Sequence, residues 1–258
     1  MPIKFSLSVS KGFFYPLRGL KLILTDWRLF RLSLLPFLVN TILFMIFFLS
    51  FNFFAYEISS RVFEQSSQAW YWAALSVTLG VLLFAVSIIV ILFIFVAIGL
   101  IIAAPFNDML AGAVEYKLSG KVTESGMSLW ELTKFTMGNE VRKMAVILAG
   151  QGLLALVNFF PGVGQAVFAI ASPIFLAFVL AYEFTGYTLD RRGFPHSKKQ
   201  NFVLSRSGLS LGFGFAVGIT LIIPVLNFLL LPLAVAGGTM LVMENPPVED
   251  TMYVAPDK

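Results

Sequence analysis

Two arginines three positions apart are the residues best suited to hold an anion. They lie in "LTDWRLFRLSLLP", residues 24–36, as Arg28 and Arg31. Residues at this spacing share one face of a helix. Thr25 or Asp26 can cap the helix start, which would leave free backbone N–H groups pointing outward. Guanidinium forks beside such groups predict a seat for a tetrahedral oxyanion. The alternative is that both arginines are anchors for lipid phosphate.

Five polar side chains are expected to line a pathway through the membrane. A buried amide costs several kcal/mol unless it is hydrogen-bonded, so each must find a partner or water. The alternatives are hydrogen bonds between helices and, for the pair at 107–108, simple helix termination. The candidates are Asn40, Asn107, Asp108, Asn158 and Asn227.

Other site chemistry is not expected. The chain has no cysteine and one histidine, His196, which follows a proline in a basic loop and is expected to be solvent-exposed. Glu115 is assigned to a solvated face. Walker, dinucleotide-binding, HExxH and nucleophile-elbow motifs are all missing from the sequence. We therefore expect no enzyme, no metal, no cofactor and no nucleic-acid partner.

The elements that position these residues are membrane helices. Of 258 residues, 58% are hydrophobic and 12% are charged, with a mean hydropathy of +0.87. Soluble domains are nearer ~45–50% apolar and ~25% charged. We predict an all-α integral membrane protein with a single membrane domain over 1–258. Its N-terminal part is an amphipathic interfacial helix over 1–31, followed by spanning helices over 32–56 and 69–118. Pro36 is expected in the first turn of the first spanning helix.

Two later apolar segments are interrupted. "NFFPGVGQ" at 158–165 and "IIPVLNF" at 222–228 divide them into arms of roughly 16–18 residues, short against the ~20 needed to cross. We predict two hemi-penetrating (re-entrant) helical hairpins, over 144–182 and 207–243. Interrupted segments at matching positions are typical of a solute pathway, so we expect the two tips to meet.

The distribution of basic residues agrees with this layout. Sixteen of the 18 lysines and arginines lie in 1–31, 108–143 and 183–206. Two crossings followed by two hairpins place all sixteen on one side, as the positive-inside rule requires. Six full crossings would place them equally well, so charge alone leaves both topologies open.

Several stretches resemble the CysZ-type sulfate permease family. They are "PLRGLKLIL" at 16–24, "LLPFLVN" at 34–40, "IAAPFNDMLAGAVEYKLSG" at 102–120, "AYEFTGYTLDRRGF" at 181–194, "LGFG" at 211–214 and "IPVLNFLLLPLAVAGGTML" at 223–241. The resemblance implies a multi-pass protein of the bacterial inner membrane that brings sulfate into the cytoplasm for cysteine synthesis. It also implies two long spanning helices, two hemi-penetrating hairpins and a homo-oligomer, a dimer or higher, in contact with membrane lipids.

The resemblance also suggests the sulfate-binding residues. The family motif is Gly-Leu-Arg-Arg shortly before the proline of the first spanning helix, where this chain has Arg28, Leu29, Phe30 and Arg31. Leu29 and Arg31 match the motif, and Arg28 stands in place of its glycine. The leading hypothesis is a sulfate permease or channel. The alternatives are a lipid-interacting scaffold of the same fold and a permease for another small solute.

Overall fold

The computed structural model describes residues 2–64, 70–222 and 227–247, and within these ranges every regular element is a helix. The chain is therefore an all-helical membrane protein. Its helices are α1 (Pro2–Thr25), α2 (Trp27–Glu64), α3 (Trp70–Ser119), α4 (Leu129–Asn158), α5 (Val163–Arg191), α6 (His196–Ser205), α7 (Ser207–Ile222) and α8 (Asn227–Glu244).

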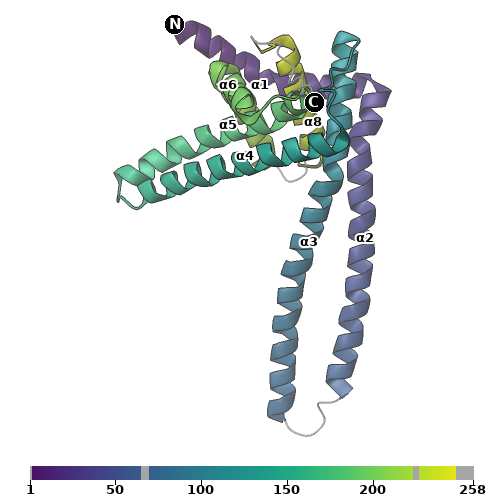
Figure 1. The fold of residues 1–258 in the computed structure, drawn as a ribbon. Helices are drawn as coiled ribbons and strands as arrows, with labels where there is room; N and C mark the ends of the chain where they lie inside the picture. Colours follow the sequence, from purple (N-terminus) through teal and green to yellow (C-terminus); the bar gives the residue numbers. More distant parts are fainter. Residues whose placement is uncertain (1, 65–69, 223–226, 248–258) are drawn as a thin grey trace. The chain divides into compact units, whose positions relative to one another are not determined.

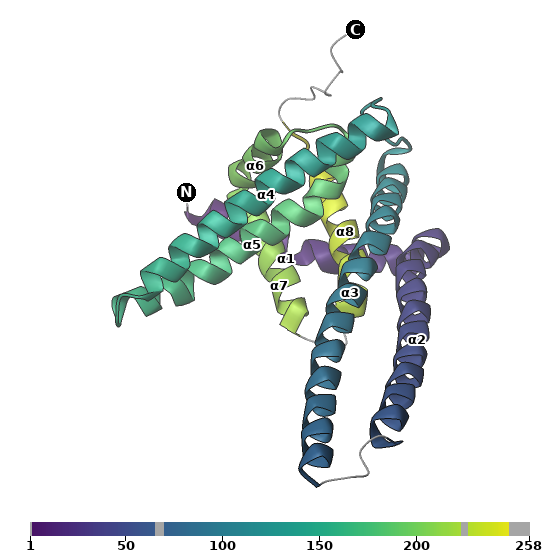
Figure 2. The ribbon, with the colours of Figure 1, turned by 60° about the horizontal axis from the view of Figure 1, so that its bottom comes forward.

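The helices form two compact units, one of residues 34–106 and one of residues 1–33 with 107–258. The smaller unit contains most of α2 and α3, which run side by side in Figures 1 and 2. The rings of Phe51 and Phe84 lie 5.2 Å apart between them. Since α3 continues to Ser119 without a break, the long uncharged stretch is one helix and not a pair.

The first helix boundary differs from the prediction. The structure ends α1 at Thr25 and begins α2 at Trp27, so residues 28–31 belong to α2 and not to the interfacial helix. Pro36 consequently lies inside α2 rather than in its first turn. The break falls at Asp26 because that side chain caps the new helix, a local signal stronger than the change in polarity several residues later.

In the larger unit, α4 and α5 form a long antiparallel hairpin (Figures 1 and 2). Ser128 and Glu131 form a capping box at the start of α4. The turn falls at 159–162, within the predicted interruption, and Gly162 adopts φ +81°, which a residue with a side chain rarely adopts.

The arms of this hairpin are longer than predicted, 30 and 29 residues, because both helices continue into charged sequence. Lys143 on α4 lies 2.6 Å from Glu183 on α5, so the charged ends pair with each other. By length and composition the described part of the chain has two helices able to cross a membrane, Trp27–Phe51 and Val163–Arg191. A third is possible only if α6 and α7, bent by 95° at their junction, count as one span. The expectation that each arm of this hairpin is about 16–18 residues long and marginal for crossing is therefore wrong for α5, which has 29 residues. The second predicted bend, at 223–226, lies outside the described residues.

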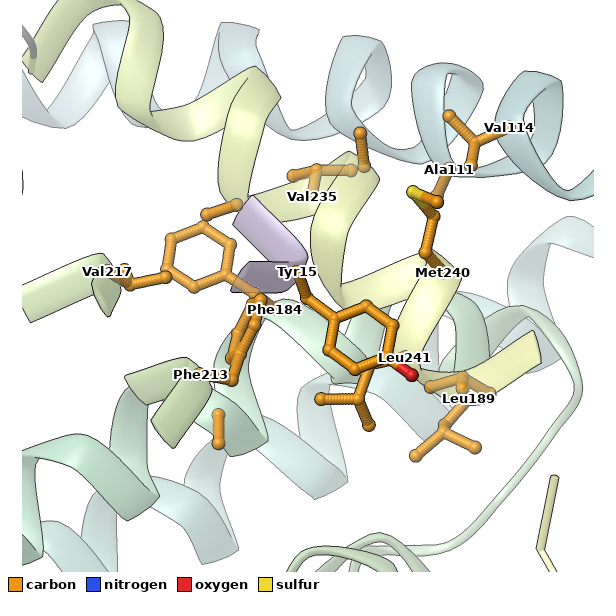
Figure 3. Packing of buried hydrophobic residues seen from close by; sticks show 14 of the residues in the cluster. Tyr15, Ala111, Val114, Phe184, Leu189, Phe213, Val217, Val235, Met240 and Leu241 are labelled. Carbon is orange, nitrogen blue, oxygen red and sulfur yellow. The ribbon is translucent and has the colours of Figure 1, made fainter. Parts of the chain in front are cut away.

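The buried core of the larger unit joins both ends of the chain. Figure 3 shows Tyr15 of α1 among side chains from α3, α5, α7 and α8, including Phe184, Phe213 and Leu241. By contrast, the apolar side chains at the turn between α4 and α5 are not packed against other helices: Phe159 is 82% exposed and Val163 is 76% exposed. Apolar patches of this kind on a membrane protein face lipid, since water would not tolerate them.

Close helix packing in this core depends on a glycine. At Gly214 of α7, an added Cβ would overlap the backbone carbonyl of Ala177 on α5. Gly214→Ala must therefore push α7 away from α5, and we expect a loss of at least ~1–3 kcal/mol in the free energy of unfolding. Thermal unfolding of the purified protein in detergent measures this loss.

The matched control is Gly152→Ala in α4, where a Cβ would meet nothing within 4 Å. That change is expected to be neutral or stabilising, because alanine is favoured over glycine inside a helix. Equal effects of the two substitutions would contradict the α5–α7 packing.

Candidate functional site

The candidate anion seat begins at the sharp junction between α1 and α2. Thr25 closes α1 by donating its hydroxyl to the carbonyl of Lys21 at 2.9 Å. Asp26 then caps α2, where its Oδ1 accepts the backbone N–H groups of Arg28 at 2.9 Å and Leu29 at 3.4 Å. The prediction of a cap at this point is confirmed. The prediction that the N–H groups are free is wrong for Arg28 and Leu29, because the cap itself occupies these two.

Of the four motif residues, two pack against the protein and two are exposed to solvent. Leu29 is 1% exposed and anchors this turn in the core, while Phe30 is partly buried and stacks on Trp27 with ring centroids 5.6 Å apart. Arg28 and Arg31 are exposed. The Arg31 guanidinium lies 4.9 Å from the centre of the Trp27 ring, an arrangement that holds it in place. The arginines are thus the two members of the motif that can reach an anion.

A lysine of α3 balances the negative charge of Asp26. Lys117, near the end of α3, lies 2.9 Å from the carboxylate of Asp26. The hydrogen bond from Lys117 holds the pKa of Asp26 below its usual range, with support from the backbone N–H groups that it caps. Asp26 is therefore ionised at neutral pH and is neutralised by Lys117, which leaves the two arginines as net positive charge.

Two of the predicted pathway residues have partners in the protein. Asn107 is 3% exposed and donates its amide to the hydroxyl of Tyr187 on α5 at 3.3 Å. Oδ2 of Asp108 accepts a hydrogen bond from Nη2 of Arg191 at 2.6 Å. Both contacts join α3 to α5. The alternative of helix termination at 107–108 is wrong, because α3 continues to Ser119.

Of the remaining pathway candidates, only Asn158 has a side chain that the structure describes. Asn158 is exposed at the last residue of α4, beside the hairpin turn. In Figure 2 this turn lies well away from the end of α7, so the described helix ends that flank the two bends do not meet. Asn40 lies in α2 and Asn227 begins α8, but the side chains of both lie outside the described residues.

A buried ion pair that the sequence did not predict lies between α3 and the end of α5. Glu115, assigned to a solvated face, is only 1% exposed, and its Oε1 accepts from Nη2 of Arg192 at 2.6 Å. Helical spacing does carry the signal: Glu115 follows Ala111 by one turn and neighbours Val114, and both of these are buried. A charge on the apolar face of a helix requires a partner.

A second polar cluster holds α6 against α4 and α5. Lys199 is 1% exposed and lies 2.8 Å from Asp190, which also accepts from the amide of Asn139 at 3.0 Å. His196 is partly buried, not solvent-exposed as predicted, because its Nδ1 hydrogen-bonds the hydroxyl of Tyr182 at 2.7 Å. Over the parts of the chain described, no three histidine or acidic side chains come together in a way that could hold a metal ion.

Comparison with known proteins identifies relatives along most of the chain. The family model described as "Sulfate transporter CysZ/Etoposide-induced protein 2.4" matches residues 15–232. The protein named sulfate transporter CysZ in Pectobacterium atrosepticum is 30% identical over 239 residues, which cover 86% of this chain and 83% of the relative. The protein of that name in Pseudomonas syringae pv. tomato is 32% identical over 234 residues, which cover 88% of this chain and 89% of the relative. The protein of that name in Vibrio cholerae is 31% identical over 245 residues, which cover 92% of this chain and 95% of the relative.

Proposed function

The chain belongs to the sulfate transporter CysZ/etoposide-induced protein 2.4 family, and we propose that it moves sulfate across the bacterial inner membrane into the cytoplasm. The observation that carries the proposal is the similarity to proteins named sulfate transporters along nearly the full length of the chain. A supply of sulfate for cysteine synthesis is the proposed purpose of this activity.

We propose that sulfate is captured by the guanidinium groups of Arg28 and Arg31. This proposal is supported by their exposure, by their positions one helical turn apart and by the Trp27 ring beside Arg31. Asp26 occupies the backbone N–H groups at the helix start, so binding depends on side chains. Binding by a few side chains suits a transporter, which must hold an ion firmly enough to accept it and weakly enough to release it.

We propose a multi-pass topology in which the basic segments face the cytoplasm. The concentration of 16 of the 18 basic residues in three segments supports one orientation. Helices α2 and α3 cross the membrane, and the hairpins α4–α5 and α7–α8 enter from the basic side and return to it. A homo-oligomer in contact with lipid is proposed as the working form, as the family resemblance implies.

The experiment is sulfate uptake into proteoliposomes containing the purified chain. A dianion entering a negative interior is opposed by about 4.6 kcal/mol per 100 mV, twice the ~2.3 kcal/mol per charge. The membrane potential must therefore be clamped at zero with equal potassium and an ionophore on both sides. We expect radiolabelled sulfate to enter down its gradient faster than into empty liposomes, and unlabelled sulfate to compete.

Protein that is folded and monodisperse but carries no sulfate would overturn the proposal. Retained anionic lipid in such a preparation, with no effect of sulfate on thermal unfolding, would favour a lipid-interacting scaffold instead. Competition by sulfite, thiosulfate or an uncharged solute but not by sulfate would favour a permease for that solute.

A further inference from the structure

A polar pocket lies where the ends of three helices of the larger unit meet. Its volume is about 270 Å³, and its polar lining consists of Ser119, Lys121, Thr123 and Arg192. Phe194 and Met243 supply apolar walls. The connection that carries two of the lining residues is held in place, because Ser125 donates its backbone N–H to the carbonyl of Arg191 at 3.0 Å. The pocket is therefore built from fixed backbone at the ends of α3, α5 and α8.

Arg192 brings unused hydrogen-bond donors to this pocket. Its Nη2 donates to Glu115 at 2.6 Å and lies 2.8 Å from the sulfur of Met243, a weak acceptor. Its Nε is buried without a partner among the described residues, and so is Oε2 of Glu115 in the same ion pair. The side chain is 9% exposed. Because Arg192 also lines the pocket, its guanidinium supplies positive charge and N–H donors to that wall.

The surroundings of the pocket are positively charged. Lys121 is exposed, and its amine makes no hydrogen bond or ion pair in the part of the chain that the structure describes. Glu115 offsets the charge of Arg192. Glu124, the residue after Thr123, is exposed and is the one acidic residue of the connection between α3 and α4. Arg206 donates to the carbonyl of Pro246, another residue of the pocket wall. Glu244, beside Met243, is already held by Arg18 and Tyr15. The excess positive charge favours an anion.

The size of the pocket restricts the anion to a small one. Sites for drug-sized organic ligands typically occupy ~300–1,000 Å³. A tetrahedral inorganic oxyanion with a few waters fits the smaller space and accepts from several donors at once. Lys121, Arg192 and the Thr123 hydroxyl are suitable donors for its oxygens.

We propose that this pocket is a second oxyanion site, formed by Lys121, Arg192 and Thr123 and separate from Arg28 and Arg31. The identification of its occupant as sulfate depends on the proposed function. Ser119 of the pocket and Lys117, which pairs with Asp26, belong to the same last turn of α3. The two sites thus lie on either side of one helical turn, which suits passage of one ion from the first to the second.

The test is equilibrium binding of radiolabelled sulfate to the full chain in detergent, at constant ionic strength maintained with chloride. We expect two classes of site. The double variant Arg28→Gln with Arg31→Gln is expected to remove one class of site. Lys121→Gln is expected to weaken the affinity of the other class for sulfate about fivefold, because the bound ion loses one charge-assisted hydrogen bond. Lys11→Gln removes the same charge from an exposed position on α1 and is expected to change neither class.

A variant that fills the pocket gives an independent result. Thr123→Trp is expected to abolish the second class while leaving the thermal unfolding temperature within a few degrees, since Thr123 is in a partly exposed connection. The proposal is overturned if Lys121→Gln behaves as Lys11→Gln, or if no sulfate binds once Arg28 and Arg31 are replaced. Binding that depends on Lys121 in a protein without sulfate flux would retain this site and reject the transport function.

Discussion

Replacement of Glu115 by alanine is expected to lower the free energy of unfolding by ~3–5 kcal/mol, the usual cost of breaking a buried ion pair. Arg192 is only 9% exposed in the protein, so the substitution leaves a buried guanidinium without its counter-ion. Arg192→Met should cost a similar amount, because it leaves the Glu115 carboxylate alone. Thermal and denaturant unfolding in detergent measure both losses.

The double variant separates charge from packing. Glu115→Leu with Arg192→Met replaces the pair by apolar groups of similar volume and should recover most of the loss. The control is Glu140→Gln: Lys143 contacts both Glu140 and Glu183, so it retains a counter-ion, and less than ~1 kcal/mol is expected. If Glu115→Ala costs no more than Glu140→Gln, the pair is not buried in the protein as the structure has it.

The second large effect concerns sulfate flux. Replacement of both Arg28 and Arg31 by glutamine is expected to lower proteoliposome uptake by at least about tenfold, because each charged hydrogen bond is worth roughly 1.5–3 kcal/mol. Arg31→Gln alone should have the larger single effect, since stacking on Trp27 fixes that guanidinium before the ion arrives. Lys21→Gln on the exposed face of α1 is the control for lost charge.

A substitution that is expected to raise sulfate uptake tests the same site. Asp26→Asn retains a good helix cap, removes a negative charge next to the arginines and releases Lys117. Uptake at low sulfate should rise about two- to threefold. Acid cannot substitute for the mutation in the usual assay range: the pKa of Asp26 is lowered, so the carboxylate stays charged until the pH falls below the ordinary aspartate value of ~3.9. Unchanged uptake in both sets of variants would remove this seat from the mechanism.

Features with local causes could be predicted from the sequence. Apolar length and the scarcity of charge indicate membrane helices, and Pro161 with Gly162 marks the turn between α4 and α5. The long uncharged stretch ending in α3 has no turn signal, so a single helix was the better interpretation. Each of these depends only on neighbours along the chain.

Features decided by distant contacts could not be predicted in the same way. Helices α4 and α5 continue past their apolar parts, and there Lys143 and Glu183, far apart in sequence, pair with each other. Whether Arg28 has free N–H groups beside it depends on which acceptor occupies them, and polarity alone does not distinguish a cap from a ligand. The burial of Glu115 was missed, although its position beside Ala111 and Val114 on an apolar helix face carried the signal.

The docking of α1 against α7 and α8 has a consequence for biosynthesis. Tyr15 hydrogen-bonds Glu244 across 229 positions of sequence, so α1 contacts residues that are synthesised 229 positions after it. At ~5–20 residues per second, α1 waits roughly 10–45 s for these neighbours. During this interval its apolar face must be sheltered by the lipid headgroup layer or by the insertion machinery. The larger unit therefore closes only after α8 has been synthesised.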